Sequence, residues 1–365
     1  LRYGLNVRIE TDVIEVENVD LLVIATDTRS MDSKSAAQVV TDIMLKLIEI
    51  NPQVIYKKID SVLRGFIIAE LESFINVIGG SQIVLVSANP SMGRIIKDKT
   101  YYINEVPLHR TGFSNDPDFP VKTSNVLELL GPSSLNTSIA NVSEDKISEG
   151  IVIAEAENEE DLRNWARSLK NNFLHAGAAG YFVALLEQLG YKSTIDKKPV
   201  INIEDKKCIY VCGSAIDSSR LAVNEVKKSG PFVCEMPEEI IFQSGDHANN
   251  MEKWFNEIEK VLEEHDRVIV AVNRSLIKEE GMAASLRKHT AEAVCMILKK
   301  HIVDELMIEG GATAYSIIQK CEYHKFDPVQ ELSHGVLRMG VIGKEDFHIT
   351  LKPGSYKWPG LIWDF

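Results

Sequence analysis

The chain has little that would suit a nucleic-acid-binding or membrane protein. Its 40 Lys and Arg residues are outnumbered by 53 Asp and Glu, so the formal charge is −13, whereas nucleic-acid binders usually present a basic face. No apolar run reaches the roughly 18 residues that a membrane span needs, and no signal peptide is visible. We therefore expect neither nucleic acid nor membrane among the partners, and a cytoplasmic location.

Metal-binding and nucleotide-binding signatures are missing as well. The five cysteines, an odd number, lack zinc-site spacing, and the nine histidines are scattered. The chain has no Walker A sequence, no Gly-x-Gly-x-x-Gly fingerprint and no His-Glu-x-x-His. We therefore expect reduced thiols and no metal held by protein side chains alone. A Mg²⁺ ion held by substrate phosphates and one or two carboxylates would leave little trace in a sequence.

What the chain does have is a repeated alternation of apolar strand-like runs and amphipathic helix-like runs. This pattern is typical of α/β folds, and a length of 365 residues favours two domains. We predict two domains, each with a mostly parallel sheet covered by helices, and an active site in the cleft between them. The predicted strands are residues 21–26, 53–57, 83–87, 151–154, 208–212, 267–272, 305–309 and 348–352. The predicted helices are residues 36–50, 66–78, 160–172, 180–189, 218–228, 250–264, 282–301 and 313–320.

Two stretches interrupt this alternation. Residues 192–207 are polar and charged, which suggests a boundary near residue 200 and domains of residues 1–200 and 201–365. Residues 89–120 contain four prolines and few helical periods, which predicts a long irregular loop of the kind that is often functional. The chain begins with Leu1 rather than Met, so we expect an opening segment to be missing.

The turn at residues 57–65 carries the densest chemistry in the chain. Lys57, Lys58, Asp60, Ser61 and Arg64 fall between a strand-like run and an apolar helix-like run. Ligands of open α/β sheets bind beyond the carboxyl ends of strands, a helix start favours anions, and Arg can bind a carboxylate bidentately. The pattern indicates a small, anionic, hydroxylated ligand, and a solvated turn with a helix cap is the alternative.

Three further residues are candidates for contact with the same ligand. Asp27 and Arg29 follow the first predicted strand, and Arg94 lies in the proline-rich loop. The alternatives are a helix cap that leaves Arg29 exposed, and an Arg94 that only pins the loop to a carboxylate.

Three loops of small residues follow strands in the second half of the chain. Their residues are Gly310, Gly311, Ala312 and Thr313, then Gly213 and Ser214, and finally Gly354. Glycines let a ligand approach the backbone, and a following helix start offers N–H groups to phosphates. Each loop alone could be a plain tight turn, but three in one half favour nucleotide binding.

Taken in order, these motifs resemble the four-carbon acid sugar kinase family, which includes threonate, erythronate and 3-oxo-tetronate kinases. The family's Lys-x-Asp-Ser-Thr-Leu-Arg-Gly pattern is similar to residues 58–65, with Val62 in place of Thr. Its Pro-x-x-Gly-Arg, Gly-Ser-Ala-Gly, Ser-Gly-Ser, Gly-Gly-Asp/Glu-Thr and Lys-x-Gly motifs are similar to segments that begin at Pro90, Gly177, Cys212, Gly310 and Lys352. The resemblance covers nearly the whole chain.

The resemblance implies transfer of the γ-phosphoryl group of ATP, with Mg²⁺, to a terminal hydroxyl of a four-carbon sugar acid. It implies catalytic roles for Asp60, as candidate base, and Arg64. Substrate-binding residues would be Asp27, Arg29, Lys58, Asp60, Ser61, Arg64 and Arg94. ATP-binding residues would be Ser214, Gly310, Gly311, Ala312, Thr313 and Gly354. The expected partners are the sugar acid and ATP, and a homodimer is one option.

Two departures from the family pattern keep other functions open. The family's opening Ala-Asp-Asp-x-Thr-Gly-Ala loop has no counterpart here, and Ala312 replaces an acidic residue. The alternatives are a degenerate protein that binds sugar acid or nucleotide without turnover, and a different α/β transferase.

Overall fold

The computed structural model describes residues 1–11, 18–116, 119–142, 148–167, 174–193, 201–213, 217–272, 282–354, 356–363 and 365. The chain divides into two compact units, one formed by Leu1–Ala25 with Thr194–Phe365 and the other by Thr26–Ser193. The first 25 residues group with the C-terminal part because their strands join its sheet, whereas the sequence had suggested residues 1–200 as one domain. Which ligand each unit binds stays a prediction.

The unit Thr26–Ser193 is built on a five-stranded sheet in which every neighbouring pair is parallel. The strand order is β3 (Tyr56–Lys58), β10 (Leu174–Gly177), β4 (Gln82–Val86), β9 (Gly150–Ala154) and β8 (Thr137–Ala140). Its helices are α1 (Ser33–Ile50), α2 (Ile67–Ile78), α3 (Val126–Leu130), α4 (Glu159–Ala166) and α5 (Ala179–Gln188). Short 3₁₀ turns occur at η1 (Thr28–Ser30), η2 (Pro90–Met92), η3 (Leu108–Arg110) and η4 (Gly112–Asn115).

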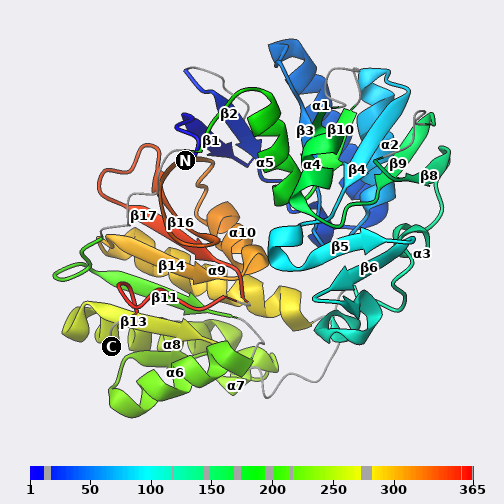
Figure 1. The fold of residues 1–365 in the computed structure, drawn as a ribbon. Coiled ribbons are helices and arrows are strands. Elements are labelled where there is room, and N and C mark those ends of the chain that lie inside the picture. Colours follow the sequence, from blue (N-terminus) through cyan, green and yellow to red (C-terminus); the bar gives the residue numbers. More distant parts are fainter. Residues whose placement is uncertain are drawn as a thin grey trace. The chain divides into compact units, whose positions relative to one another are not determined.

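Alternate residues of the central strands of this sheet enter two different cores. Ile83 and Leu85 of β4 pack with α1 and α2, while Val84 and Val86 pack with α4 and α5 on the other face (Figure 1). Successive side chains of a strand point to opposite faces, so a strand covered by helices on both faces is apolar at every position. All five residues of β9 are buried for this reason.

The prediction of an irregular loop at residues 89–120 is wrong in part. This region contains a three-stranded antiparallel sheet of β5 (Arg94–Lys97), β6 (Thr100–Ile103) and β7 (Val106–Pro107). The strands have two to four residues, which is too short to give a clear alternation of polar and apolar residues, and the prolines masked them further.

The other unit contains a nine-stranded mixed sheet. Its order is β12 (Val233–Glu235), β13 (Arg267–Ala271), β11 (Cys208–Cys212), β14 (Glu305–Glu309), β17 (His348–Lys352), β16 (Val336–Val341), β15 (Lys325–Ser333), β1 (Val7–Glu10) and β2 (Leu21–Ile24). The pairs β12–β13, β13–β11, β11–β14 and β14–β17 are parallel. The pairs β17–β16, β16–β15 and β15–β1 are antiparallel. Its helices are α6 (Asp217–Ser229), α7 (Glu238–Ile241), α8 (His247–His265), α9 (Met282–Lys300) and α10 (Gly311–Lys320).

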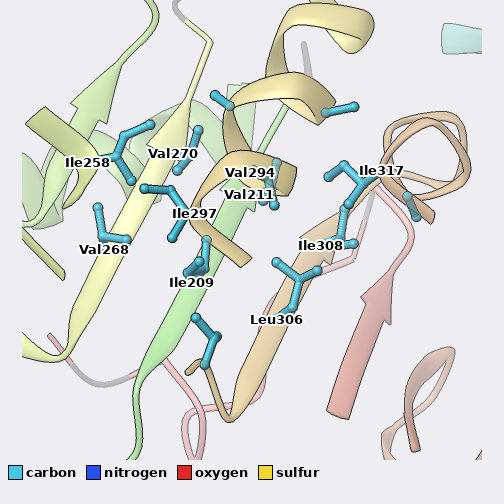
Figure 2. Packing of buried hydrophobic residues seen from close by; sticks show 14 of the residues in the cluster. Ile209, Val211, Ile258, Val268, Val270, Val294, Ile297, Leu306, Ile308 and Ile317 are labelled. Atoms are coloured by element: carbon cyan, nitrogen blue, oxygen red, sulfur yellow. The ribbon is translucent and has the colours of Figure 1, made fainter. Parts of the chain in front are cut away.

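The core of this unit lies between the parallel strands and helices α8, α9 and α10. Figure 2 shows Ile209 and Val268 from the sheet near Ile258 and Ile297 from the helices. On the other face of the sheet, Cys208, Tyr210 and Cys212 share a second core. Cys208 and Cys212 therefore lie on one face of β11 and pack there, and all five cysteines are free thiols.

The predicted α/β class is confirmed, and each predicted strand and helix overlaps an observed one. Part of the predicted helix at residues 160–172 lies outside the described residues. Helix starts follow local capping chemistry: Asp32 and Asp246 accept from the backbone N–H groups of Ser35 and Asn249, which satisfies donors that have no partner inside the helix. Among the described residues, no helix is both long and apolar enough to cross a membrane.

Candidate functional site

The turn that follows β3 is held by its apolar residues. Ile59, Val62 and Leu63 are buried, and the N–H of Ile59 donates to the carbonyl of Gly177 at 3.0 Å. Leu63 has a left-handed φ of 62°, a conformation that costs a non-glycine residue stability unless the surroundings enforce it. The packed apolar side chains thus fix a turn whose polar side chains remain available for chemistry.

Asp60 and Arg64 form a bidentate ion pair across this turn. Arg64 Nε donates to Asp60 Oδ2 at 3.0 Å, and Arg64 Nη2 donates to Asp60 Oδ1 at 2.9 Å. Arg29 Nη1 lies 3.4 Å from the same carboxylate, and the backbone N–H groups of Val62 and Arg64 donate to Oδ2 at 3.2 Å. Burial alone would raise the pKa of Asp60, but the hydrogen bonds and charge of Arg64 outweigh it, so the pKa is lowered and the carboxylate is ionised at neutral pH.

The remaining side of the Arg64 guanidinium is also bound. Its Nη1 donates to Asp116 Oδ2 at 2.7 Å, and its Cζ lies 5.2 Å from the centre of the Phe113 ring. Three of its nitrogens therefore already contact carboxylates. A substrate carboxylate could use this guanidinium only by displacing Asp60 or Asp116, which makes Arg64 better placed to hold the turn than to hold a ligand.

Two other cations, Lys58 in the turn and Arg94 at the start of β5, contact uncharged oxygens. Lys58 Nζ donates to the carbonyl of Ile59 at 2.5 Å, and Arg94 Nη1 donates to Ser61 Oγ. Neither forms an ion pair with a described carboxylate. Although Lys58 as a whole is exposed, partial desolvation of its ammonium lowers its pKa, Asp60 partly offsets this, and Lys57 and Arg94 lower the pKa further. An anion beside Lys58 and Arg94 would relieve this excess of positive charge.

Arg29, which follows the first predicted strand (residues 21–26), contacts the turn after β3. Asp27 adopts a left-handed φ of 47° at the start of η1, which directs the chain so that Arg29 reaches Asp60. A Cβ added to Gly65 would lie 3.5 Å from the Arg29 side chain. The structure therefore brings together Arg29, Lys58, Asp60, Ser61, Arg64 and Arg94, which the sequence had proposed as one group.

Sequence reasoning gave neither Tyr101 nor Asp116 a role in the site. The buried Tyr101 hydroxyl donates to the backbone carbonyl of Ser61, and burial raises the pKa of Tyr101. Tyr101 belongs to β6 and Asp116 follows η4, so both contacts depend on how the 89–120 region folds back. Nothing in the sequence near residue 61 signals them.

The small-residue loops of the other unit gather at one sheet edge. Strands β11, β14 and β17 are parallel neighbours, so their carboxyl ends lie side by side. The N–H of Gly310 donates to the carbonyl of Lys352 at 2.8 Å, and a Cβ added to Gly213 would lie 3.2 Å from Thr313 Oγ1. Gly354 follows β17 by two residues, and Ser214 lies outside the described residues.

The start of α10 has the geometry expected for an approach by phosphate. Gly310 precedes the helix with a φ of 93°, a value suited to glycine. A Cβ added to Gly311 would meet nothing within 4 Å, so no distant segment crowds this position. Ala312 and Thr313 continue the first turn of α10, where N–H groups lack partners within the helix.

The sequence analysis also did not predict a buried ion pair beside the Gly310 loop. Glu309 and Lys352 end the neighbouring strands β14 and β17, and Lys352 Nζ lies 3.3 Å from Glu309 Oε2, with each side chain only 1% exposed. Lys352 also donates to the carbonyls of Pro353 and Tyr356 at 3.2 and 2.6 Å. The sequence offered one signal, a charged residue at the carboxyl end of each of two predicted strands. The pair ties the Gly310 loop to the 352–356 segment.

Comparisons with known proteins identify relatives of this chain. The model of a sugar-binding N-terminal domain family matches residues 2–185, half of the chain. The D-threonate kinase of Salmonella typhimurium is 29% identical over 228 residues, which are 56% of this chain and 51% of that protein. The D-erythronate kinase of Heliobacterium modesticaldum is 29% identical over 116 residues, 32% of this chain and 26% of that protein. The chain thus matches about half the length of these curated relatives, or less.

Solved structures share the fold at lower identity. Haemophilus influenzae protein HI1011 has a TM-score of 0.69 at 18% identity, covering 98% of this chain and 92% of its own. A Salmonella typhimurium LT2 protein provisionally described as a tRNA synthase has a TM-score of 0.78 at 16% identity, covering 97% and 91%. The resemblance that the motifs suggested is confirmed by the family match and the named relatives: the chain belongs to the four-carbon acid sugar kinase family.

Proposed function

We propose that this protein transfers the γ-phosphoryl group of ATP to a terminal hydroxyl of a four-carbon sugar acid such as threonate, erythronate or 3-oxo-tetronate. The observation that carries the proposal is the turn after β3. There Lys58 and Arg94 lack carboxylate partners among the described residues, beside the hydroxyl of Ser61. A sugar acid offers a carboxylate for the two cations and hydroxyls for Ser61, so its chemistry matches that of the turn.

Each residue of the turn has a distinct task in this proposal. Lys58 and Arg94 bind the substrate carboxylate, and Arg29 and Arg64 keep Asp60 ionised and in place. Asp60 is the proposed base for the attacking hydroxyl. Its lowered pKa makes it a weak base, but phosphoryl transfer has a loose transition state that depends more on positioning and charge stabilisation than on a strong base.

ATP is proposed to bind at the edge formed by Gly213, Gly310 to Thr313 and Gly354. Because no distant segment crowds Gly311, phosphates can reach the N–H groups at the start of α10, where the helix dipole favours negative charge. The nearby carboxylate of Glu309 is buried and neutralised by Lys352. Mg²⁺ would therefore be held chiefly by the ATP phosphates, as this ion often is, and would supply charge neutralisation during transfer.

Because Ala312 replaces an acidic residue of the family pattern, the alternative is a protein that binds these ligands without turnover. The experiment measures ADP release by the full-length protein, with ATP and Mg²⁺, against a panel of threonate, erythronate and 3-oxo-tetronate stereoisomers. We expect one panel member to be turned over well above the rate of ATP hydrolysis without acid. Calorimetric binding of ATP and an acid with no turnover would overturn the kinase proposal in favour of the binding protein.

A further inference from the structure

Helices α8 and α9 bring two histidines and a glutamate together. One ring nitrogen of His247, one of His289 and a carboxylate oxygen of Glu292 all lie within 4.8 Å of one another. The two imidazole rings have centroids 4.5 Å apart. His289 and Glu292 are three residues apart on α9, which places them on one helix face, and His247 comes from the first turn of α8.

His289 shows why these residues are more than neighbours. Its ring is buried, and its Nε2 lies 3.1 Å from Ser285 Oγ, which also accepts from Gln243 Nε2 at 3.1 Å. Its Nδ1 is buried and has no hydrogen-bond partner. An unpaired buried polar atom costs the fold stability. Metal-binding histidines commonly donate their second ring nitrogen to an oxygen in this way, which fixes the tautomer and turns the other lone pair toward the ion.

A second group on the same two helices provides a contrast. Glu259, Glu263 and His301 also bring three potential ligand atoms within 4.8 Å, but Glu259 is bound by Lys300 and His301, each at 2.5 Å. The Lys300 ammonium already neutralises Glu259, where a metal cation would otherwise bind. Glu292, in contrast, makes no ion pair within 4.0 Å in the part of the chain that the structure describes.

We propose that His247, His289 and Glu292 bind one Zn²⁺ ion, with His289 coordinating through Nδ1 and water completing the shell. Two imidazole nitrogens and one carboxylate suit zinc, whereas Mg²⁺ and Ca²⁺ prefer all-oxygen sites. This ion is separate from the Mg²⁺ of the kinase reaction. Because its ligands come from α8 and α9, the ion joins the two helices and stabilises the folded state by mass action.

The test uses the full-length protein, stripped with a chelator and titrated with zinc chloride by calorimetry, with melting temperature as a second readout. We expect one equivalent of Zn²⁺ to bind and to raise the melting temperature. His247→Ala and Glu292→Gln, which change partly exposed side chains, should abolish both effects. Ser285→Ala should weaken binding by about 10- to 100-fold, as loss of a partner behind a metal ligand does.

Glu263→Gln in the contrasting group is the matched control and should bind Zn²⁺ like the unchanged protein. Replacement of zinc by Co²⁺ should give the visible absorption of a low-coordinate site, and His247→Ala should remove it. Zinc binding that survives both His247→Ala and Glu292→Gln, or an absence of binding by the unchanged protein, would overturn the proposal.

Discussion

The two strand-end regions of this protein prepare for negative charge in different ways. After β3, side chains carry the chemistry, with Arg29, Lys58, Arg64 and Arg94 gathered around Asp60. At the ends of β11, β14 and β17, small residues expose the backbone, and the two charged side chains, Glu309 and Lys352, are buried against each other. The first arrangement suits a ligand that must be recognised by its carboxylate and hydroxyls. The second suits a polyphosphate, which backbone N–H groups can bind without side-chain selectivity.

The largest effect on stability should come from the buried Glu309–Lys352 ion pair beside the Gly310 loop. Glu309→Gln leaves Lys352 buried without its counter-ion, and breaking such a pair costs about 3–5 kcal/mol. We expect a loss of this size in the free energy of unfolding, measured by chemical denaturation. Ser219→Ala removes only the 2.7 Å hydrogen bond to Glu309 and should cost about 1 kcal/mol. Equal, small losses for both variants would show that the pair contributes little.

A smaller loss is expected at the charged turn. Asp60 and Arg64 are 18% and 20% exposed, so Asp60→Asn should cost toward the lower end of the roughly 3–5 kcal/mol of a buried pair. The folded-state pKa of Asp60 is lowered. Its contribution is therefore fully present above the unfolded pKa of about 3.9 and is lost as pH falls through the folded value.

Denaturation at pH 7 and at a series of acidic pH values measures this contribution. The unchanged protein should lose stability more steeply than Asp60→Asn as pH falls below about 4. If the two proteins have parallel pH profiles, the ion pair does not stabilise the folded state.

Replacement of Lys58 should weaken sugar-acid binding without lowering the stability of the fold. Lys58 is exposed and forms no ion pair with a described carboxylate, so Lys58→Met should leave the free energy of unfolding nearly unchanged. Loss of a charge-assisted contact to the substrate should raise the KM for the sugar acid by about 10- to 100-fold. Steady-state kinetics at saturating ATP measures this. An unchanged KM would remove Lys58 from the substrate site.

Much of the fold followed from the sequence because buried parallel strands and amphipathic helices leave strong local patterns. Strand β11 is apolar throughout and β14 has an apolar centre between two Glu residues, and both were predicted with the bounds that the structure has. Strand β15 contains Pro328 and alternates only weakly between buried and exposed positions, so it was missed. Its antiparallel pairing with β16 makes the larger sheet mixed.

Residue spacing alone predicted contacts within the site only where they are local. Asp60 and Arg64 are four residues apart, so their proximity follows from the turn itself. The contact of Arg64 with Asp116 joins residues 52 positions apart, and it decides that the guanidinium is already occupied. His247 and His289 are likewise brought together only by the packing of α8 on α9, so no spacing in the sequence could signal them.

The central claim is that the turn after β3 binds the sugar acid and that the small-residue loops after β11, β14 and β17 bind ATP. Calorimetry of both ligands with Lys58→Met and Gly311→Val tests it most directly, because a Cβ at Gly311 meets nothing within 4 Å and the fold should tolerate the change. We expect Lys58→Met to weaken only the sugar acid, and Gly311→Val to weaken only ATP, by about tenfold or 1.4 kcal/mol. If each variant weakened the other ligand, or if Gly311→Val lowered stability as much as ATP affinity, the assignment of the two regions would be contradicted.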